Sequence, residues 1–170
     1  MGRRVLIALA ACAVAVAGGV TIRAQRSSAT PGVAGPIDKA VLQRVVSAWA
    51  SMDVARAAPF YARDSGLVFY DVAPRKYTGW TEYAKGTTEM FKGLKSLTMT
   101  VADDAQVHAA SNLAWAAATV DGEMVAKDGT RTKIDARWST VWEKRQSGWV
   151  IVHDHFSMPL PDAAPKPSRD

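Results

Sequence analysis

Asp71 is the residue of this sequence best placed to move a proton. It lies at the end of an apolar run rich in β-branched and aromatic residues, 67–72, which has the composition of a β-strand. A carboxylate at the mouth of an apolar pocket is poorly solvated, so its pKa rises toward the range that suits proton exchange beside a carbonyl group. We therefore expect Asp71 to act as a catalytic base. The alternative is a structural aspartate that opens the turn before Pro74.

His153, Asp154 and His155 form a second titratable group, within the strand-like run 149–157. Strict alternation places the two histidines on one face and Asp154 on the other. A His-x-His pair can ligate a metal ion, but a third ligand is needed and His108 is the only other histidine, so no metal site is expected. The histidines are then structural, at an interface, or acids and bases of a pocket. A single bulge in this strand would exchange its two faces, so alternation alone does not decide which face lines the pocket. If the histidines point outward, Asp154 is the pocket carboxylate.

The aromatic residues are numerous enough to line a pocket for a flat apolar ligand, although core packing explains most of them equally well. The set expected to supply two or three side chains to the pocket is Trp49, Tyr61, Tyr70, Tyr83, Trp115, Trp138 and Trp142. Arg137 shares a predicted strand face with Glu143, which allows either a structural ion pair or a clamp for a substrate carboxylate. We expect the pocket to bind a small hydrophobic molecule, without a cofactor.

Three helices are predicted in the first half of the chain to position these residues. The first begins near Pro36 and carries an apolar stripe at three- and four-residue spacing. Asp53 is placed to cap a short second helix that runs to about Phe60. The third helix is expected over 81–92.

Strand-like runs surround the third helix and fill the second half of the chain. They are 67–72, 76–78, 96–103, 106–110, 113–126, 130–144 and 149–157. The later runs are long, and long strands in a twisted sheet bend, often at bulges. Three successive alanines, 116–118, would leave room on the concave side. Alternation in the last run groups Ile151 with the histidines and puts large apolar residues on both faces, so the sheet must be covered by helices on one side and by a partner on the other.

The first 24 residues have the layout of a secretory signal, with Arg3 and Arg4 preceding an apolar stretch, and cleavage would follow Ala17 or Ala24. We expect export to the periplasm or out of the cell. The alternatives are an uncleaved membrane anchor and, from the Leu-Ala-Ala-Cys box that ends at Cys12, a lipoprotein.

The remaining boundaries and the charge complete this picture. A flexible linker is expected over 25–35, the folded domain over 36–160 and a disordered tail over 161–170.

The net charge of +5 falls to +2 without the three arginines of the first 24 residues, which is too little for a nucleic-acid partner. Cys12 is the only cysteine, so the mature domain would have no disulfide, cysteine nucleophile or thiolate metal site.

Several short motifs resemble one known superfamily. They are Tyr-Ala-Arg-Asp at 61–64, the strand that ends in Asp71, Thr-Gly-Trp at 78–80, and the segment 142–157. Together they resemble the nuclear transport factor 2 superfamily, most closely its SnoaL-like and ketosteroid-isomerase-like branch. The last segment also resembles the end of the calcium/calmodulin-dependent kinase association domain. The resemblance implies an α+β cone, in which three helices from the N-terminal half pack on the concave face of a curved antiparallel sheet, and a homodimer through the outer sheet face.

The resemblance also bears on chemistry, and there the chain departs from the isomerases. Asp71 stands two residues later than the isomerase general base, on the same face, and Phe69 takes the strictly aligned place. The first helix offers Trp49 and Ser47 where the isomerases have an oxyanion-hole tyrosine, which argues against steroid isomerase activity itself.

Two functions follow as rival hypotheses. One is a domain that binds a small hydrophobic or carbonyl-bearing molecule and performs cofactor-free acid–base chemistry of the isomerase, cyclase or dehydratase type, with Asp71 as base assisted by His153, His155 or Asp154. The other is a non-catalytic ligand carrier or assembly module. Ionisable groups that converge in one cavity with perturbed pKa values would favour the enzyme, and a cavity lined only by Trp, Val and Ala would favour the carrier.

Overall fold

A computed structural model describes residues 32–72 and 74–159 of the chain. The predicted signal, most of the predicted linker and the predicted tail lie outside these residues. Within them, no helix combines the length and the apolar character needed to cross a membrane.

The helices begin at side chains that cap them. Helix α1, Lys39–Ala50, starts three residues later than Pro36 because the Asp38 carboxylate accepts a hydrogen bond from the Val41 backbone at 2.8 Å. Asp53 caps the short helix α2, Val54–Ala57, as predicted, and a 3₁₀ turn, Ala58–Phe60, follows it. Helix α3 spans Gly79–Phe91. Each longer helix buries one apolar stripe toward the sheet.

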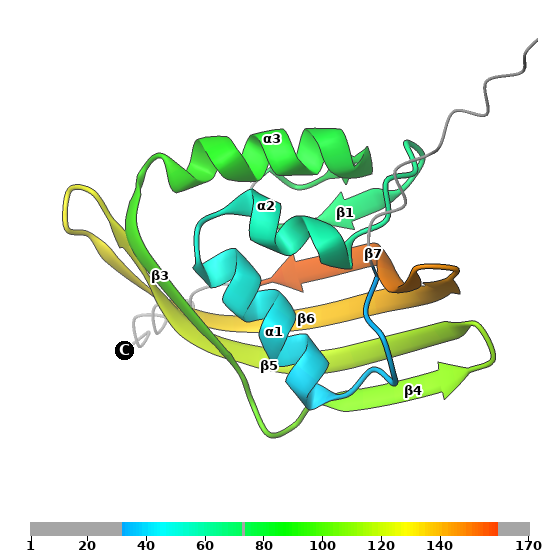
Figure 1. The fold of residues 1–170 in the computed structure, drawn as a ribbon. Helices are drawn as coiled ribbons and strands as arrows, with labels where there is room; N and C mark the ends of the chain where they lie inside the picture. Colours follow the sequence, from blue (N-terminus) through cyan, green and yellow to red (C-terminus); the bar gives the residue numbers. More distant parts are fainter. Residues whose placement is uncertain (1–31, 73, 160–170) are drawn as a thin grey trace, which may run out of the picture.

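Seven strands form one sheet in the order β2-β1-β7-β6-β5-β3, with β4 also paired to β5. The strands are β1 Val68–Tyr70, β2 Tyr77–Thr78, β3 Leu94–Val101, β4 Gln106–Ala110, β5 Leu113–Ala126, β6 Arg131–Arg145 and β7 Gly148–Ser157. All pairs are antiparallel except β1 with β7, which is parallel and was not expected. The predicted α+β class with a curved, mostly antiparallel sheet is confirmed, and all three helices lie on one side of the sheet (Figure 1).

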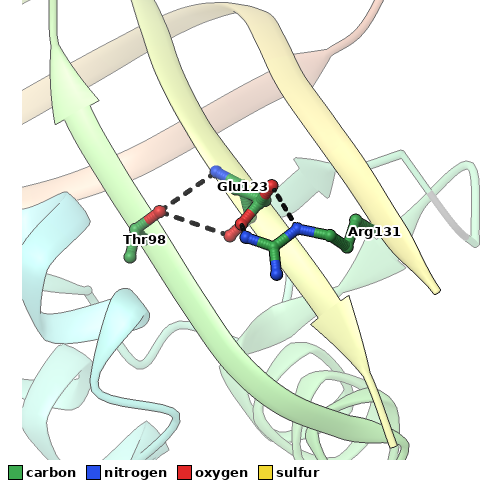
Figure 2. Close-up of polar contacts among 3 residues, drawn as sticks. All are labelled: Thr98, Glu123 and Arg131. Atoms are coloured by element: carbon green, nitrogen blue, oxygen red, sulfur yellow. Dashed lines mark hydrogen bonds and ion pairs between the residues drawn. The ribbon is translucent and has the colours of Figure 1, made fainter. Parts of the chain in front are cut away.

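The sheet bends where β5 passes from one neighbour to the next. The first half of β5 pairs with β4 and the second half with β3. In the second half, a Cβ added at Gly122 would lie 1.9 Å from the Thr98 carbonyl oxygen, so only glycine allows β3 to approach this closely. Beside this bend, the Glu123 backbone bonds the Thr98 hydroxyl and its carboxylate pairs with Arg131 of β6 (Figure 2).

Strand β7 contains a bulge that reverses its faces. Val141 of β6 pairs with His153, whereas the next residue, Trp142, pairs with Ile151, so Val152 is the extra residue. Ile151 and Asp154 are therefore both buried beneath the helices. The alternation that grouped Ile151 with His153 and His155 was wrong, because it assumed an unbroken strand.

Candidate functional site

A cavity of about 130 Å³ lies between the helices and the concave face of the sheet. Its walls come from α1, α3, the end of β1 and strands β3, β5, β6 and β7. They comprise Val46, Trp49, Asp71, Val72, Tyr83, Thr87, Met90, Phe91, Leu97, Met99, Met124, Ile134, Trp138, Asp154, Phe156 and Met158. An apolar cavity of about 150 Å³ is large enough to hold benzene. The cavity, which is partly open to solvent, therefore has room for a single six-membered ring.

Asp154 is the buried carboxyl group of this cavity. The bulge turns it inward, where its side chain is held by the Trp138 indole, which donates to Oδ1 at 2.7 Å, and by the Tyr61 hydroxyl, which donates to Oδ2. Trp49 in turn donates to the Tyr61 oxygen at 2.8 Å. Burial raises the pKa of Asp154 to about 7, because loss of hydration outweighs the two hydrogen bonds that favour the charged form.

Asp71 is the second carboxyl group of the cavity, just beyond the end of β1. Its Oδ1 accepts a bond from the Val72 backbone at 2.7 Å, and among the described residues it has no other hydrogen-bond partner. Burial raises the pKa of Asp71 to about 6, against the smaller opposing effect of that backbone bond. One carboxylate oxygen thus stays available to a ligand.

The two carboxyl groups influence each other. The negative charge of Asp71 raises the pKa of Asp154 further, in addition to the larger effect of burial. Two such groups titrate as a pair, and between about pH 6 and pH 7 the pair holds close to one proton. The cavity can therefore both accept and supply a proton near neutral pH.

Trp49, Tyr83 and Trp138, three of the predicted ligand-binding aromatics, line the cavity. Tyr83 stacks on Phe69 with ring centroids 5.1 Å apart. Tyr61 is fully buried behind Asp154 and acts on the site through that carboxyl group. Burial raises the pKa of both Tyr61 and Tyr83 well above the ordinary value, so both hydroxyls keep their protons.

The other predicted site residues lie on the outer face of the sheet, away from the cavity. Trp115 is 49% exposed and Arg137 is exposed, because their neighbours along the strands point inward. Tyr70 contacts the rings of His153 and His155, and His153 Nδ1 donates to the Val68 carbonyl at 2.8 Å. None of these five residues lines the cavity, whereas three of the aromatic set do, as expected.

Residues that sequence reasoning missed make up most of the wall. Four of the six methionines of the chain line the cavity: Met90, Met99, Met124 and Met158. Alternation along β3 and β5 was the available signal, since Leu97 and Met124 are cross-strand partners on one face. No three metal-ligating side chains cluster within 32–72 or 74–159.

Comparison with known proteins identifies related folds. A family model described as a SnoaL-like domain matches residues 39–161. A nuclear transport factor 2-like superfamily protein from Salmonella enterica is 22% identical, with a TM-score of 0.66 over 76% of this chain and 94% of that one. A dehydratase candidate of the same superfamily from Streptomyces avermitilis is 13% identical, with a TM-score of 0.62 over 72% and 96%. The association domain of C. elegans CaMKII is 21% identical, with a TM-score of 0.53 over 70% and 91%. The comparison with curated proteins finds no match.

Proposed function

Because the chain belongs to the SnoaL-like domain family, whose fold carries both enzymes and binding modules, we propose that it binds a small carbonyl-bearing molecule in its cavity and catalyses proton transfer beside the carbonyl group. The observation that carries the proposal is the convergence of Asp71 and Asp154, both with raised pKa values, in an otherwise apolar cavity. This is the arrangement that favours an enzyme over a carrier.

Asp71 is the proposed base. With a pKa of about 6 it is mostly ionised at neutral pH, and one of its oxygens is free of hydrogen bonds within the described chain. It removes a proton from the carbon next to the carbonyl group. The C–H bonding pair becomes the carbon–carbon double bond of an enolate, and the carbonyl oxygen takes the negative charge.

Asp154 is the proposed second proton carrier. With a pKa of about 7 it holds a proton in about half of the molecules at neutral pH, and the bonds from Tyr61 and Trp138 fix its position. The protonated carboxyl group returns a proton to the enolate at a different atom, which completes an isomerisation. Its partners are rigid aromatic side chains, so this group is held in place before the substrate arrives.

Deuterium exchange tests the proposal without knowledge of the natural substrate. Cyclohexanone, one ring with one carbonyl group, is incubated with the protein in D₂O, and loss of the α-proton signals is followed by ¹H NMR. The Asp71→Asn variant is expected to exchange at least about 100-fold more slowly than the wild type. Asp121→Asn, an exposed aspartate, is the matched control and should keep full activity. Equal rates in wild type and Asp71→Asn would remove Asp71 from the mechanism, and no acceleration by the wild type would favour the carrier.

A second proposal, self-association, rests on the outer face of the sheet. Cross-strand pairing places His108, Trp115, Val141 and His153 in one row across β4, β5, β6 and β7, and Tyr70 extends it. We call these five residues the outer row. A second copy of the chain would cover this partly apolar row, in keeping with the burial of both sheet faces predicted from the sequence. One structural relative is itself an association domain.

Export is the third element of the proposal and rests on the predicted signal at 1–24 alone. Expression of the full chain in a bacterial host, followed by fractionation and N-terminal sequencing, tests it. Recovery from the periplasm with an N-terminus at residue 18 or 25 is the expected result. Intact protein in the cytoplasm would contradict it.

A further inference from the structure

Two hydroxyl groups of α3, those of Tyr83 and Thr87, stand one helical turn apart in the cavity wall. Tyr83 and Thr87 are four residues apart, so they share one face of the helix, and both line the cavity. They are 5% and 3% exposed. Thr87 Oγ1 is fully buried and has no hydrogen-bond partner among the described residues. Within the same residues the Tyr83 hydroxyl forms no hydrogen bond.

The neighbouring threonine shows that this state is not imposed by the helix. Thr88 donates its hydroxyl proton to the Ala84 carbonyl, four residues earlier, at 2.7 Å. This is the usual way for a helical threonine to satisfy its hydroxyl group. Thr87 does not form the equivalent bond. An unsatisfied buried hydroxyl destabilises the folded chain, and such a group calls for an explanation such as a ligand.

The two hydroxyl groups can donate hydrogen bonds to a ligand, which ionised carboxyl groups cannot do. An ionised carboxylate only accepts hydrogen bonds, whereas a neutral hydroxyl donates one. Tyr83 stays protonated because burial raises its pKa well above the ordinary value. A ligand that presents an oxygen atom to this wall would satisfy both hydroxyls and turn its remaining surface to methionine and aromatic side chains.

We propose that Tyr83 and Thr87 form an oxygen-binding subsite, and that the ligand of the cavity is a single-ring ketone whose carbonyl oxygen accepts hydrogen bonds from both hydroxyls. The choice of a carbonyl group rests on the proposed function. The choice of one ring rests on the volume of the partly open cavity, about 130 Å³. During proton removal by Asp71, the two donors would stabilise the negative charge that forms on this oxygen.

The methionine side chains determine which ring substituents the cavity can accommodate. Met99 and Met124 form part of the sheet wall, and the exposed lining residues Met90 and Val72 mark the mouth. Methionine side chains are flexible and polarizable, so they adapt to different ring substituents. Selectivity therefore comes from the hydroxyl pair, and substituents on the ring extend toward the mouth.

Binding of two molecules of similar shape tests the subsite. Cyclohexanone and methylcyclohexane are titrated into ¹⁵N-labelled protein, and their dissociation constants are obtained from amide shifts. Tyr83→Phe and Thr87→Val, which each remove one hydroxyl group, are expected to weaken cyclohexanone binding by about threefold to tenfold and to leave methylcyclohexane binding unchanged. Thr88→Val on the same helix and Tyr70→Phe on the outer face are the matched controls, with no effect on either ligand.

The thermal midpoint supplies a second readout. Thr87→Val removes an unpaired buried hydroxyl and should raise the midpoint of the free protein while it weakens ketone binding. Equal weakening of both ligands, variants that match the controls, or a wild type that does not bind cyclohexanone would each overturn the proposal. A wild-type protein that binds cyclohexanone through the two hydroxyls but does not accelerate its deuterium exchange would contradict the proton-transfer proposal alone and leave the subsite standing.

Discussion

At the scale of single residues, the carboxyl group of Asp154 is under two opposing influences. Hydrogen bonds from Tyr61 and Trp138 favour its charged form, and burial beneath the helices favours its neutral form. Burial dominates, and the pKa rises from the ordinary 3.8 to about 7. The pKa of Asp71 is also raised by burial, against the opposing effect of a single hydrogen bond from the Val72 backbone. The cavity therefore holds its acid and its base at the cost of folding stability.

The pH dependence of unfolding measures that cost. The pKa of Asp154 is higher in the folded state, so its neutral form contributes stability that is fully present below about pH 4 and is lost as the pH rises to about 7. One such group changes the free energy of unfolding by at most about 1.4 kcal/mol per pH unit. We predict that Asp154→Asn, followed by urea unfolding between pH 4 and pH 8, gives a flatter curve than the wild type. Parallel curves would mean that Asp154 titrates normally in the folded protein.

At the scale of elements, two local irregularities place the site. The bulge at Val152 turns Asp154 inward, and the bend at Gly122 brings β3 against β5. Met99 and Ile134, the cross-strand partners of Gly122, both line the cavity. The bend thus shapes the cavity wall, and an unbroken flat sheet would lose both the carboxyl group and the wall.

A side chain at Gly122 is predicted to disrupt this bend. The Cβ of Gly122→Ala would lie 1.9 Å from the Thr98 carbonyl oxygen, so β3 must move away from β5. The expected loss is about 3 kcal/mol in the free energy of unfolding, at the upper end for overpacking, as measured by urea titration. Gly66→Ala is the control, since nothing lies within 4 Å of its added Cβ, and it should be nearly neutral. Similar stability of the two variants would contradict the proposed role of Gly122.

At the scale of the whole molecule, the sheet separates two surfaces with different proposed uses. The helices lie over the concave face of the sheet (Figure 1). The cavity lies between the helices and this face, and the outer row lies on the opposite face. Trp115 is 49% exposed within that row and stacks on His108 with ring centroids 5.3 Å apart. An exposed tryptophan of this kind is typical of a residue that dominates an interface.

Self-association is predicted to depend on Trp115. Trp115→Glu places a charge within the outer row and should weaken the dimer at least about tenfold, as measured by sedimentation equilibrium. Gln146→Glu adds the same charge in the turn between β6 and β7 and should leave the dimer intact. A wild-type protein that stays monomeric at all accessible concentrations would rule out the outer row as a dimer interface. Deuterium exchange should not change in Trp115→Glu, because this residue lies outside the cavity.

The elements were predictable from the sequence because each has a strong local signal. Asp53 as a cap and the order of helices and strands agree with the structure, with ends shifted by a few residues. Which side chains of a strand face the cavity and which face outward was harder to predict. A valine such as Val152 in a bulge looks like any strand residue, and an aromatic such as Trp115 fits an outer face as well as a pocket.

The location of the cavity could not be predicted from local sequence patterns either. Ala116 and Ala118 are buried, as their small size suggested, but the cavity lies farther along β5, near Gly122 and Met124. Helical spacing groups Thr87 with Tyr83 on the buried face of α3, but only tertiary packing shows that this face meets a cavity.

The central claim is that Asp71 and Asp154 share one apolar cavity and titrate near neutral pH. Carboxyl ¹³C NMR of the protein labelled at aspartate, followed from pH 3 to pH 9 and assigned with Asp71→Asn and Asp154→Asn, measures this directly. The predicted result is two coupled titrations with apparent pKa values of about 6 and about 7, and a fall in the pKa of Asp154 when Asp71 is replaced. Two independent titrations near pH 4 would contradict the account.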